Sequence, residues 1–258
     1  MTMRVALTGG ATGIGAAIAA KLLAGGHEVV AFDITQPSQD VSQWIQTDLS
    51  EPASIAVALD RATGTFDALI NNAGLPPREG LEQAILQVNY FGMRAFLTGM
   101  LDKLDRGASI VNTASRAGAM WRDNLDEIKA LMALDPADLS DFIKTRSMDA
   151  THAYNLSKEA VIILTMAQTE AMIQRGLRMN SVSPAAVSTG ILDDFTKAFG
   201  PKVAKNIARA GRPGTPEEIA DIILFLISPQ SAWIKGQDIT IDGGMSAMGI
   251  TDMMGLPR

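Results

Sequence analysis

The chain has 258 residues and a formal net charge of −6, and 47% of its residues are hydrophobic, which is enough for one large α/β domain. It has no cysteine and two histidines, so disulfides, thiolate nucleophiles and cysteine zinc sites are excluded and no metal site is expected. No Lys/Arg run indicates a nucleic-acid surface, the first strand begins by Arg4, which leaves no room for a signal peptide, and no apolar segment reaches the roughly 20 residues of a membrane helix. We therefore expect a cytoplasmic protein with neither a nucleic-acid nor a membrane partner.

A glycine-rich turn follows the first expected strand. Residues 5–7 are apolar, residues 8–15 read Thr-Gly-Gly-Ala-Thr-Gly-Ile-Gly, and residues 16–23 have a helical pattern of small side chains. Glycines here allow a positive φ, a close approach of the backbone to a pyrophosphate, and close packing of helix and strand. The N-terminus of the helix then offers unpaired N–H groups to phosphates. An ordinary tight turn is the alternative, but the flanking strand and helix favour dinucleotide binding.

An acidic residue ends the second expected strand, at residues 27–32. Asp33 lies 20 residues after Gly13, where a dinucleotide-binding fold places the carboxylate that accepts hydrogen bonds from the adenosine ribose. A carboxylate there repels the additional phosphate of NADP, and no Arg or Lys occurs at residues 11, 12, 34 or 35 to attract it. A solvated aspartate at a strand end is the alternative. The sequence predicts NAD as the cofactor.

The next elements alternate between strand and helix. The strands are continuous apolar runs, which is typical of a parallel sheet covered on both faces. We expect strands at 44–47, 66–70 and 109–113, a helix from Pro52 to about 62 with an N-cap at Ser50-Glu51, and a long helix at 81–104 with Asn89 in its middle. Without repeats or linkers, the chain is expected to form a single domain over residues 1–258.

Residues 116–153 interrupt this alternation. Apolar side chains recur at helical spacing in 125–132 and again in 139–143, with Asp135-Pro136 between them, which predicts two short amphipathic helices. Afterwards we expect a helix at 154–175, a strand at 178–182, an irregular or partly helical stretch at 184–212, a helix capped by Thr215 and ending near 227, a strand at 238–241, and a Met-rich tail.

Tyr154 and Lys158 are spaced to lie on one face of a helix. A phenol has a pKa of about 10 in water, and a nearby ammonium lowers it because it favours the phenolate. With a cationic nicotinamide also bound, the phenol would become a general base for an alcohol proton, and a general acid in the reverse direction. Tyr and Lys at this spacing on an ordinary helix surface are the alternative.

The motifs occur together in one order. Along the chain stand Thr8-Gly-x-x-x-Gly13-x-Gly15, Asn71-Asn-Ala-Gly74, Asn89, Ser115 and Tyr154-x-x-x-Lys158. From Arg4 to Gly244 the chain resembles the short-chain dehydrogenase/reductase family in its compact form. The resemblance implies an α/β, doubly wound Rossmann fold with a seven-stranded parallel sheet, helices on both faces and a helical insertion at about 116–153. It also implies a single NAD-binding oxidoreductase domain that transfers hydride between an alcohol and NAD.

The resemblance implies roles for individual residues. Tyr154 would be the acid/base, Ser115 would orient the substrate oxygen, and Lys158 would hold the nicotinamide ribose and tune Tyr154. Asn89 would hold a water that links Lys158 to solvent, with a surface amide or a local backbone binder as the alternative. The cofactor-binding residues implied are Gly9, Thr12, Gly13, Ile14, Gly15, Asp33, Asp48 (at the adenine), Leu49, Asn72, Ala73, Gly74, Tyr154, Lys158, Pro184, Val187 and Thr189 (at the carboxamide).

The chain departs from the family pattern at two places. Pro184-Ala185 stands where the family usually has Pro-Gly, and the interval from Ser115 to Tyr154 is unusually long. This interval is most similar to the branch acting on 3α-hydroxysteroids and on aryl-allylic alcohols such as coniferyl alcohol, so a substrate of that kind is expected. The alternatives are a reductase of a small polar carbonyl, a non-catalytic dinucleotide-binding sensor on the same fold, and an extended-branch sugar-nucleotide epimerase or dehydratase, for which little chain remains after Gly244.

Two further expectations concern the surroundings of the site. An apolar substrate pocket is expected from Met120, Trp121, Ile191, Leu192, Phe195 and Phe199, with plain core packing as the alternative. Arg116 is expected either to bind a substrate carboxylate or to pair with the inserted helices. In the family, the helix beginning at the tyrosine commonly forms a subunit interface with the helix carrying Asn89. We expect the insertion to cover that interface in part, so that a homo-oligomer is a dimer rather than a tetramer.

Overall fold

A seven-stranded sheet forms the centre of the molecule; the structure is a computed structural model that describes residues 2–256. The strands are Arg4–Thr8 (β1), Glu28–Asp33 (β2), Gln43–Gln46 (β3), Phe66–Asn71 (β4), Leu104–Thr113 (β5), Arg178–Pro184 (β6) and Asp238–Ile241 (β7). Their order is β3-β2-β1-β4-β5-β6-β7, and every neighbouring pair is parallel. The predicted doubly wound α/β fold is confirmed, with the winding direction reversing between β1 and β4.

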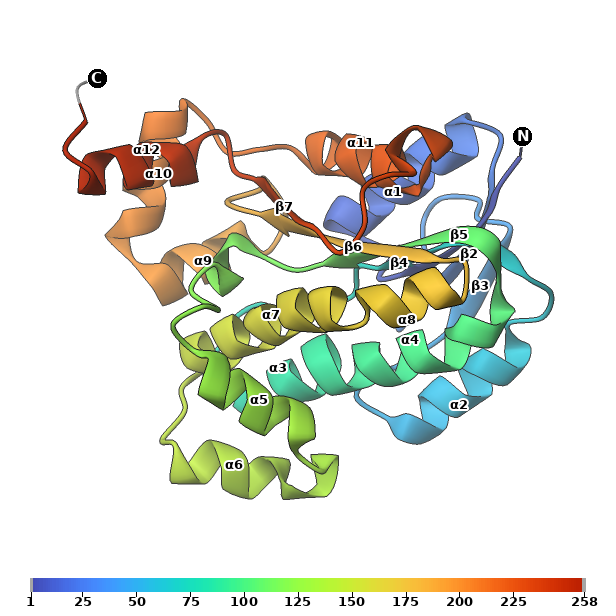
Figure 1. Cartoon of the computed structure of the whole chain (residues 1–258), viewed down its shortest axis with the longest axis horizontal. Helices are drawn as coiled ribbons and strands as arrows, with labels where there is room; N and C mark the ends of the chain where they lie inside the picture. Colours follow the sequence, from blue (N-terminus) through green and yellow to red (C-terminus); the bar gives the residue numbers. More distant parts are fainter. Residues whose placement is uncertain (1, 257–258) are drawn as a thin grey trace.

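Helices cover both faces of the sheet (Figure 1). One face carries α1 (Gly13–Ala24) and α11 (Pro216–Ile227), whose fully buried Ile18 and Ile223 belong to one apolar cluster with β1 and β4. The helix α11 begins at a capping box, in which the Thr215 side chain accepts from the backbone N–H of Glu218 and the Glu218 side chain accepts from that of Thr215. The predicted cap at Thr215 is therefore confirmed.

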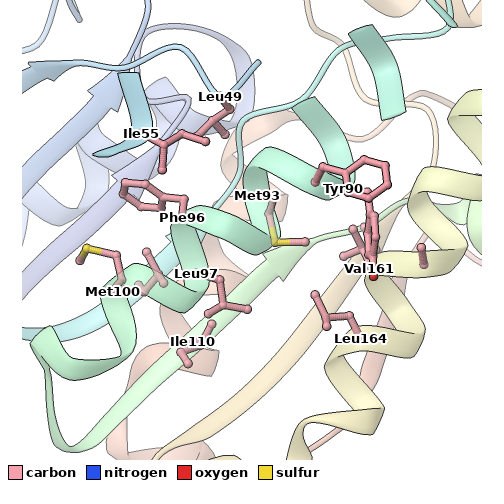
Figure 2. Packing of buried hydrophobic residues seen from close by; sticks show 14 of the residues in the cluster. Leu49, Ile55, Tyr90, Met93, Phe96, Leu97, Met100, Ile110, Val161 and Leu164 are labelled. Atoms are coloured by element: carbon pink, nitrogen blue, oxygen red, sulfur yellow. The ribbon is translucent and has the colours of Figure 1, made fainter. Parts of the chain in front are cut away.

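The other face carries a larger apolar cluster. Its helical elements are α2 (Pro52–Arg61), α3 (Glu82–Leu86), the π-helix η1 (Gln87–Gly92), α4 (Met93–Met100), α7 (Ala150–Ala167) and α8 (Thr169–Gln174). Figure 2 shows Phe96 of α4 pointing toward Ile55 of α2, and Leu97 toward Ile110 of β5. Full burial of side chains such as these contributes about 1.5–3 kcal/mol each, so this layer holds α7, which carries Tyr154, firmly against the sheet.

The insertion contains the two helices that its sequence predicts. They are α5 (Leu125–Ala133) and α6 (Leu139–Thr145), and both lie outside α3 and α7 (Figure 1). Ile128, Leu131 and Leu139 are fully buried, so the apolar stripe of the insertion packs on this chain's own helices. The short 3₁₀ segments are η2 (Leu101–Lys103), η3 (Arg116–Gly118), η4 (Pro136–Asp138) and η5 (Pro229–Ser231).

Three helices lie together at the end of the sheet where the strands terminate: α9 (Leu192–Phe199), α10 (Pro201–Ala210) and α12 (Met245–Met253) (Figure 1). Residues 184–212 were expected to be irregular or partly helical, and α9 and α10 form the helical part. Gly200, at φ 66°, separates α9 from α10, and Pro201 starts the second helix. The Met-rich tail is also helical, which its sequence did not lead us to expect.

Several predicted boundaries were wrong. The helix expected at 81–104 is interrupted by the π-helix η1, and β5 already begins at Leu104. The helix carrying the tyrosine begins at Ala150, because the Asp149 side chain caps it by accepting from the backbone N–H of His152 at 2.7 Å. Ser50 does not cap α2: its hydroxyl donates to Asp48 Oδ1 at 2.7 Å. Among residues 2–256, no helix is both long enough and apolar enough to cross a membrane.

Candidate active site

A cavity of about 1060 Å³ opens at the carboxyl ends of the central strands. Its lining includes Gly9 after β1, Asn72 after β4, Ser115 after β5, and Pro184 at the end of β6. In open α/β sheets, ligands bind at the carboxyl ends of the strands where the winding direction reverses. The position of the cavity thus follows from the strand order.

The glycine-rich turn forms one end of the cavity. Gly13 has φ 54°, and a Cβ atom there would lie 3.4 Å from Thr189 Cγ2, filling the space between the two residues. The N-cap residue Thr12 makes no side-chain cap to α1, so the first N–H groups of this helix remain available to phosphate oxygens. This open cradle fits the pyrophosphate of a dinucleotide.

Gly15 has a different function from Gly9 and Gly13, which line the cavity. A Cβ atom at Gly15 would lie 1.7 Å from the carbonyl oxygen of Gly9 and 2.7 Å from Asn72 Nδ2. Gly15 does not line the cavity. It allows the first turn of α1 to pack directly on the backbone that ends β1, and so contributes to the site through packing rather than through contact.

Two carboxylates mark the same end of the cavity. Asp33 accepts the backbone N–H of Ala11 through Oδ2 and that of Thr35 through Oδ1, both at 2.9 Å. Asp48 Oδ1 accepts from the backbone N–H of Ser50 at 2.8 Å. Each carboxylate is thus oriented by the backbone and keeps lone pairs free. Oxygen acceptors in this position suit the ribose hydroxyls and the amino group of an adenosine.

Tyr154, Lys158 and Ser115 lie together on the cavity wall. Lys158 Nζ donates to the carbonyl oxygen of Thr113 at 2.9 Å and lies 5.7 Å from the centre of the Tyr154 ring. Ser115 Oγ accepts from the backbone N–H of Ala117 at 3.1 Å. The predicted common face of Tyr154 and Lys158 is present, and β5 ends at the position that brings the serine to it.

Burial dominates the protonation of these groups. It raises the pKa of Tyr154 to about 12, an effect that the hydrogen bond with Ser115 opposes. It lowers the pKa of Lys158 to about 8. Among the protein's own residues, the hydrogen bond with Ser115 opposes the rise in the pKa of Tyr154, and the expected lowering by Lys158 is not found. The phenol is protonated at neutral pH.

Asn89 lies behind the cavity wall rather than on it. The residue is 2% exposed in the π-helix η1, so it is not a surface amide. Its Oδ1 accepts from the backbone N–H of Leu75 at 2.7 Å, and its Nδ2 donates to the carbonyl oxygen of Leu75 at 3.0 Å and to Ser157 Oγ at 3.3 Å. A Cβ atom at Gly74 would lie 3.1 Å from Asn89 Oδ1 and 3.5 Å from Lys158 Nζ. The Asn89 side chain holds the loop after β4 beside Lys158.

The other predicted residues are largely brought together. The cavity is lined by Gly9, Thr12, Gly13, Ile14, Asp33, Asp48, Leu49, Asn72, Ala73, Gly74, Pro184, Val187 and Thr189, together with Met120, Ile191, Phe195 and Phe199 of the expected apolar pocket. Trp121 and Leu192 do not line it. The Phe195 ring meets the Tyr154 ring edge-to-face at 5.3 Å, and Phe199 stacks on Phe195 at 6.3 Å.

Sequence reasoning missed the part of the cavity wall that α10 and α12 form. Lys202, Val203 and Asn206 of α10 and Met245 of α12 also line the cavity. The first three share a helical face, a pattern that becomes readable only once residues 201–210 are known to be a helix.

Arg116 lines the cavity and does not pair with the inserted helices, so binding of a substrate carboxylate is the expectation that stays a prediction. Its Nε donates to Ser246 Oγ at 2.5 Å and lies 3.8 Å from Asp242 Oδ2. Arg116 thus ties the turn after Ser115 to the C-terminal segment rather than to the inserted helices. Within residues 2–256, no group of three or more His, Asp or Glu side chains is placed to hold a metal ion.

Comparisons with known proteins agree with this geometry. A family profile described as short chain dehydrogenase matches residues 3–125, and one described as enoyl-(acyl carrier protein) reductase matches residues 138–246. The chain is 32% identical to the coniferyl-alcohol dehydrogenase of Pseudomonas sp. strain HR199, over 95% of this chain and 96% of the relative. It is 30% identical to the 3-alpha-hydroxysteroid dehydrogenase/carbonyl reductase of Comamonas testosteroni, again over 95% and 96%. The crystal structure of the 3-alpha-hydroxysteroid dehydrogenase from Pseudomonas sp. B-0831 complexed with NADH has a TM-score of 0.81 and 32% identity, covering 95% of this chain and 98% of that one.

Proposed function

We propose, from the chain's membership of the short-chain dehydrogenase/reductase family, that it interconverts an apolar, ring-bearing alcohol and its carbonyl compound with NAD(H). The chain is an oxidoreductase of that family's type. The observation that carries the proposal is the placement of Tyr154, Ser115 and Lys158 on one cavity wall with the phosphate cradle and the oriented Asp33. Cofactor and acid/base chemistry then share one cavity.

The proton chemistry follows from three side chains. In the reductive direction Tyr154 Oη donates its proton to the carbonyl oxygen, and in the oxidative direction it takes the proton from the alcohol. Ser115 holds the same oxygen by a hydrogen bond, with its own Oγ fixed by the N–H of Ala117. Lys158 holds a ribose hydroxyl and stabilises the phenolate when charged. When bound, the dinucleotide supplies the hydride donor or acceptor and, in its oxidised form, a positive charge.

The raised pKa of Tyr154 gives the two directions different pH dependences. With a pKa of about 12, the phenol is protonated at neutral pH and ready to act as the acid in carbonyl reduction. Alcohol oxidation needs the phenolate, so its rate rises with pH. We propose that reduction is favoured near neutral pH and oxidation under alkaline conditions.

Replacing the acid/base tests the proposal. Tyr154→Phe keeps the ring contact with Phe195 and removes the proton carrier, so kcat should fall roughly 100-fold or more. NADH binding, followed by fluorescence titration, should change little. A Tyr154→Phe enzyme with near-normal turnover would show that another group moves the proton.

Cofactor preference rests on Asp33. No Lys or Arg lies beside it in sequence, and two backbone hydrogen bonds orient its carboxylate, which supports its proposed contact with the adenosine ribose. We propose that kcat/KM is higher with NAD(H) than with NADP(H). Asp33→Asn should lower the ratio of kcat/KM with NAD(H) to kcat/KM with NADP(H) about tenfold. Equal or better use of NADP(H) by the unmodified enzyme would refute this assignment.

The substrate class is proposed from the wall around Tyr154. Met120, Ile191, Phe195 and Phe199 present apolar surface, which suits a hydroxysteroid or an aryl alcohol better than a small polar carbonyl compound. The relatives named for coniferyl alcohol and for 3-alpha-hydroxysteroids support this choice. Following NAD reduction with a panel of steroid, aryl and small aliphatic alcohols tests it, and a preference for the aliphatic members would contradict it.

The insertion bears on assembly. It packs on the helices that carry Tyr154 and Asn89, and Arg94 of α4 donates to the carbonyl oxygen of Met132 of α5 at 2.9 Å. We propose that this cover leaves the enzyme a homodimer rather than a tetramer, with contact through β7 and the Met-rich tail. Light scattering at micromolar concentration tests this. A stable tetramer using the Asn89 and Tyr154 helices would overturn it.

A further inference from the structure

We propose that Lys202 binds an anionic group at the far end of the substrate, so that the preferred alcohol carries a carboxylate separated from its hydroxyl by an apolar body. This inference rests on the proposed function, because it places the reacting hydroxyl at Tyr154. It goes further by naming the second chemical group that the substrate needs and the residue that selects for it.

The first argument comes from the charged side chains that line the cavity. These are Asp33, Asp48, Arg116, Lys158 and Lys202. The two aspartates accept hydrogen bonds from backbone N–H groups, Arg116 contacts Asp242 and Ser246, and Lys158 donates to a carbonyl oxygen. Within residues 2–256, Lys202 alone of the five makes neither an ion pair nor a hydrogen bond. Lys202 is an exposed residue of the cavity lining, and its ammonium is free to bind a ligand.

The second argument is the path from Tyr154 to Lys202. The Phe195 ring lies 5.3 Å from the Tyr154 ring, and the Phe199 ring lies 6.3 Å from Phe195 and nearly parallel to it. Lys202 follows at the start of α10, just after Gly200 and Pro201. In the proposed binding mode, a substrate whose hydroxyl meets Tyr154 lies along the two aromatic rings and extends toward Lys202. This arrangement suits a rigid apolar body with a hydroxyl at one end and an anion at the other.

The third argument is the face that α10 turns to the cavity. Lys202, Val203 and Asn206 line the cavity, whereas Lys205 does not, and Arg209 pairs with Asp252 at 2.7 Å. Asn206 therefore places an amide donor one helical turn beyond the ammonium, beside the apolar Val203. A cation with a neighbouring amide donor can bind a carboxylate through both of its oxygens.

The charges at the glycine-turn end of the cavity agree with this direction. Asp33 and Asp48 stand at the end formed by the glycine turn and β2, where they disfavour an anionic substrate group. The chain as a whole also carries a net charge of −6. Of the three cations that line the cavity, Arg116 and Lys158 already have protein partners, so Lys202 is the one that we assign to the anionic group, with the substrate hydroxyl toward Tyr154.

Two anions could reach Lys202: the carboxylate of the substrate and a phosphate of the cofactor. The experiment separates them with matched substrates and a matched control. Each ring alcohol of the panel is assayed as the carboxylic acid and as its methyl ester, for example 4-(4-hydroxycyclohexyl)benzoate and its ester, with Lys202→Met and with Lys205→Met. The control variant removes the same charge from the same helix at a position outside the cavity.

The unmodified enzyme should prefer acids to esters, and Lys202→Met should lower kcat/KM for the acids about fivefold, the effect of a partly exposed ion pair. The fall in kcat/KM should come from a higher KM for the acids, and it should become smaller as ionic strength rises, because salt screens the ion pair. For the esters, Lys202→Met should change kcat/KM less than about twofold. Lys205→Met should change kcat/KM less than about twofold for both acids and esters.

Other results overturn the inference in recognisable ways. A parallel loss for acids and esters, with weaker NADH binding by calorimetry, would assign Lys202 to the cofactor phosphates. No preference for acids in the unmodified enzyme would show that the far end of the substrate is uncharged. If no ring alcohol or its ketone is turned over although NADH binds normally, the proposed function itself fails, a result distinct from equal turnover of acids and esters.

Discussion

The two ends of the cavity are built in different ways. At the cofactor end, β1 contributes the fully buried Val5, Ala6 and Leu7, and the glycine turn is fixed by close contacts between backbone atoms. At the substrate end, α9, α10 and α12 contain no fully buried residue. Segments with few buried apolar contacts open more easily and tolerate replacement. The rigid end is suited to hold a constant ligand, and the lightly packed end can adapt its side chains to a particular substrate.

A pair of glycine substitutions should separate the two ends most strongly. In Gly15→Ala, the new Cβ atom would lie 1.7 Å from the carbonyl oxygen of Gly9, so backbone must move at a cost of about 3 kcal/mol or more in the free energy of unfolding. In Gly190→Ala, at the start of the substrate wall, the new Cβ atom meets nothing within 4 Å, and the change should stay within about 0.5 kcal/mol. Urea denaturation measures both. Similar losses for the two variants would contradict the difference in packing.

The cofactor end of the cavity could be predicted from the sequence better than the substrate end. The glycine turn, Asp33, Ser115 and the Tyr154–Lys158 spacing were all predictable, because each depends on a short segment: a turn, a strand end or one helical face. The continuous apolar strands that alternate with helices indicated a parallel sheet, and the family resemblance implied that this sheet is doubly wound. The seven strands were each expected close to their observed positions, with the start of β5 as the main exception.

The substrate wall could not be read in this way. The helices α9 and α10 are amphipathic but contain no fully buried residue, so their pattern does not reveal that they line the cavity. The contact of Arg116 with Asp242 and Ser246 joins segments more than a hundred residues apart, so no local sequence pattern predicts it. The pKa of Tyr154 also escaped prediction, because it depends on burial by residues from many elements rather than on the nearby Lys158.

A second test measures how much the buried Lys158 lowers the free energy of unfolding. Lys158 is buried, and its pKa is lowered from 10.5 to about 8, so the folded state disfavours the ammonium. At pH 7 the lysine is charged in both the folded and the unfolded state, and this penalty is fully present. Lys158→Met removes it, at the cost of the hydrogen bond to Thr113, and should raise the free energy of unfolding by about 2 kcal/mol.

The pH dependence identifies the cause of that gain. Above pH 8 the folded unmodified protein loses the proton, while the unfolded chain keeps it up to 10.5, so the unmodified protein gains stability as pH rises through this window. The advantage of Lys158→Met should therefore shrink between pH 8 and 10.5. Thermal unfolding at several pH values measures this, with the exposed Lys205→Met as the control. A Met variant less stable than the unmodified protein at pH 7 would show that the ammonium stabilises the fold.

The smallest expected effects come from two aromatic pairs of the same geometry. Phe195 meets Tyr154 edge-to-face at 5.3 Å on the substrate wall, and Phe96 meets Phe32 edge-to-face at 4.8 Å in the core. Phe96 is fully buried, so Phe96→Leu should cost about 1–2 kcal/mol of stability and leave KM for ring alcohols unchanged. Phe195 is half-buried, so Phe195→Leu should leave stability within about 0.5 kcal/mol. It should raise KM for ring alcohols about threefold, because the substrate loses part of its aromatic wall beside the phenol. If Phe195→Leu instead destabilised the protein as much as Phe96→Leu without changing KM, the substrate wall would have to be regarded as part of the core.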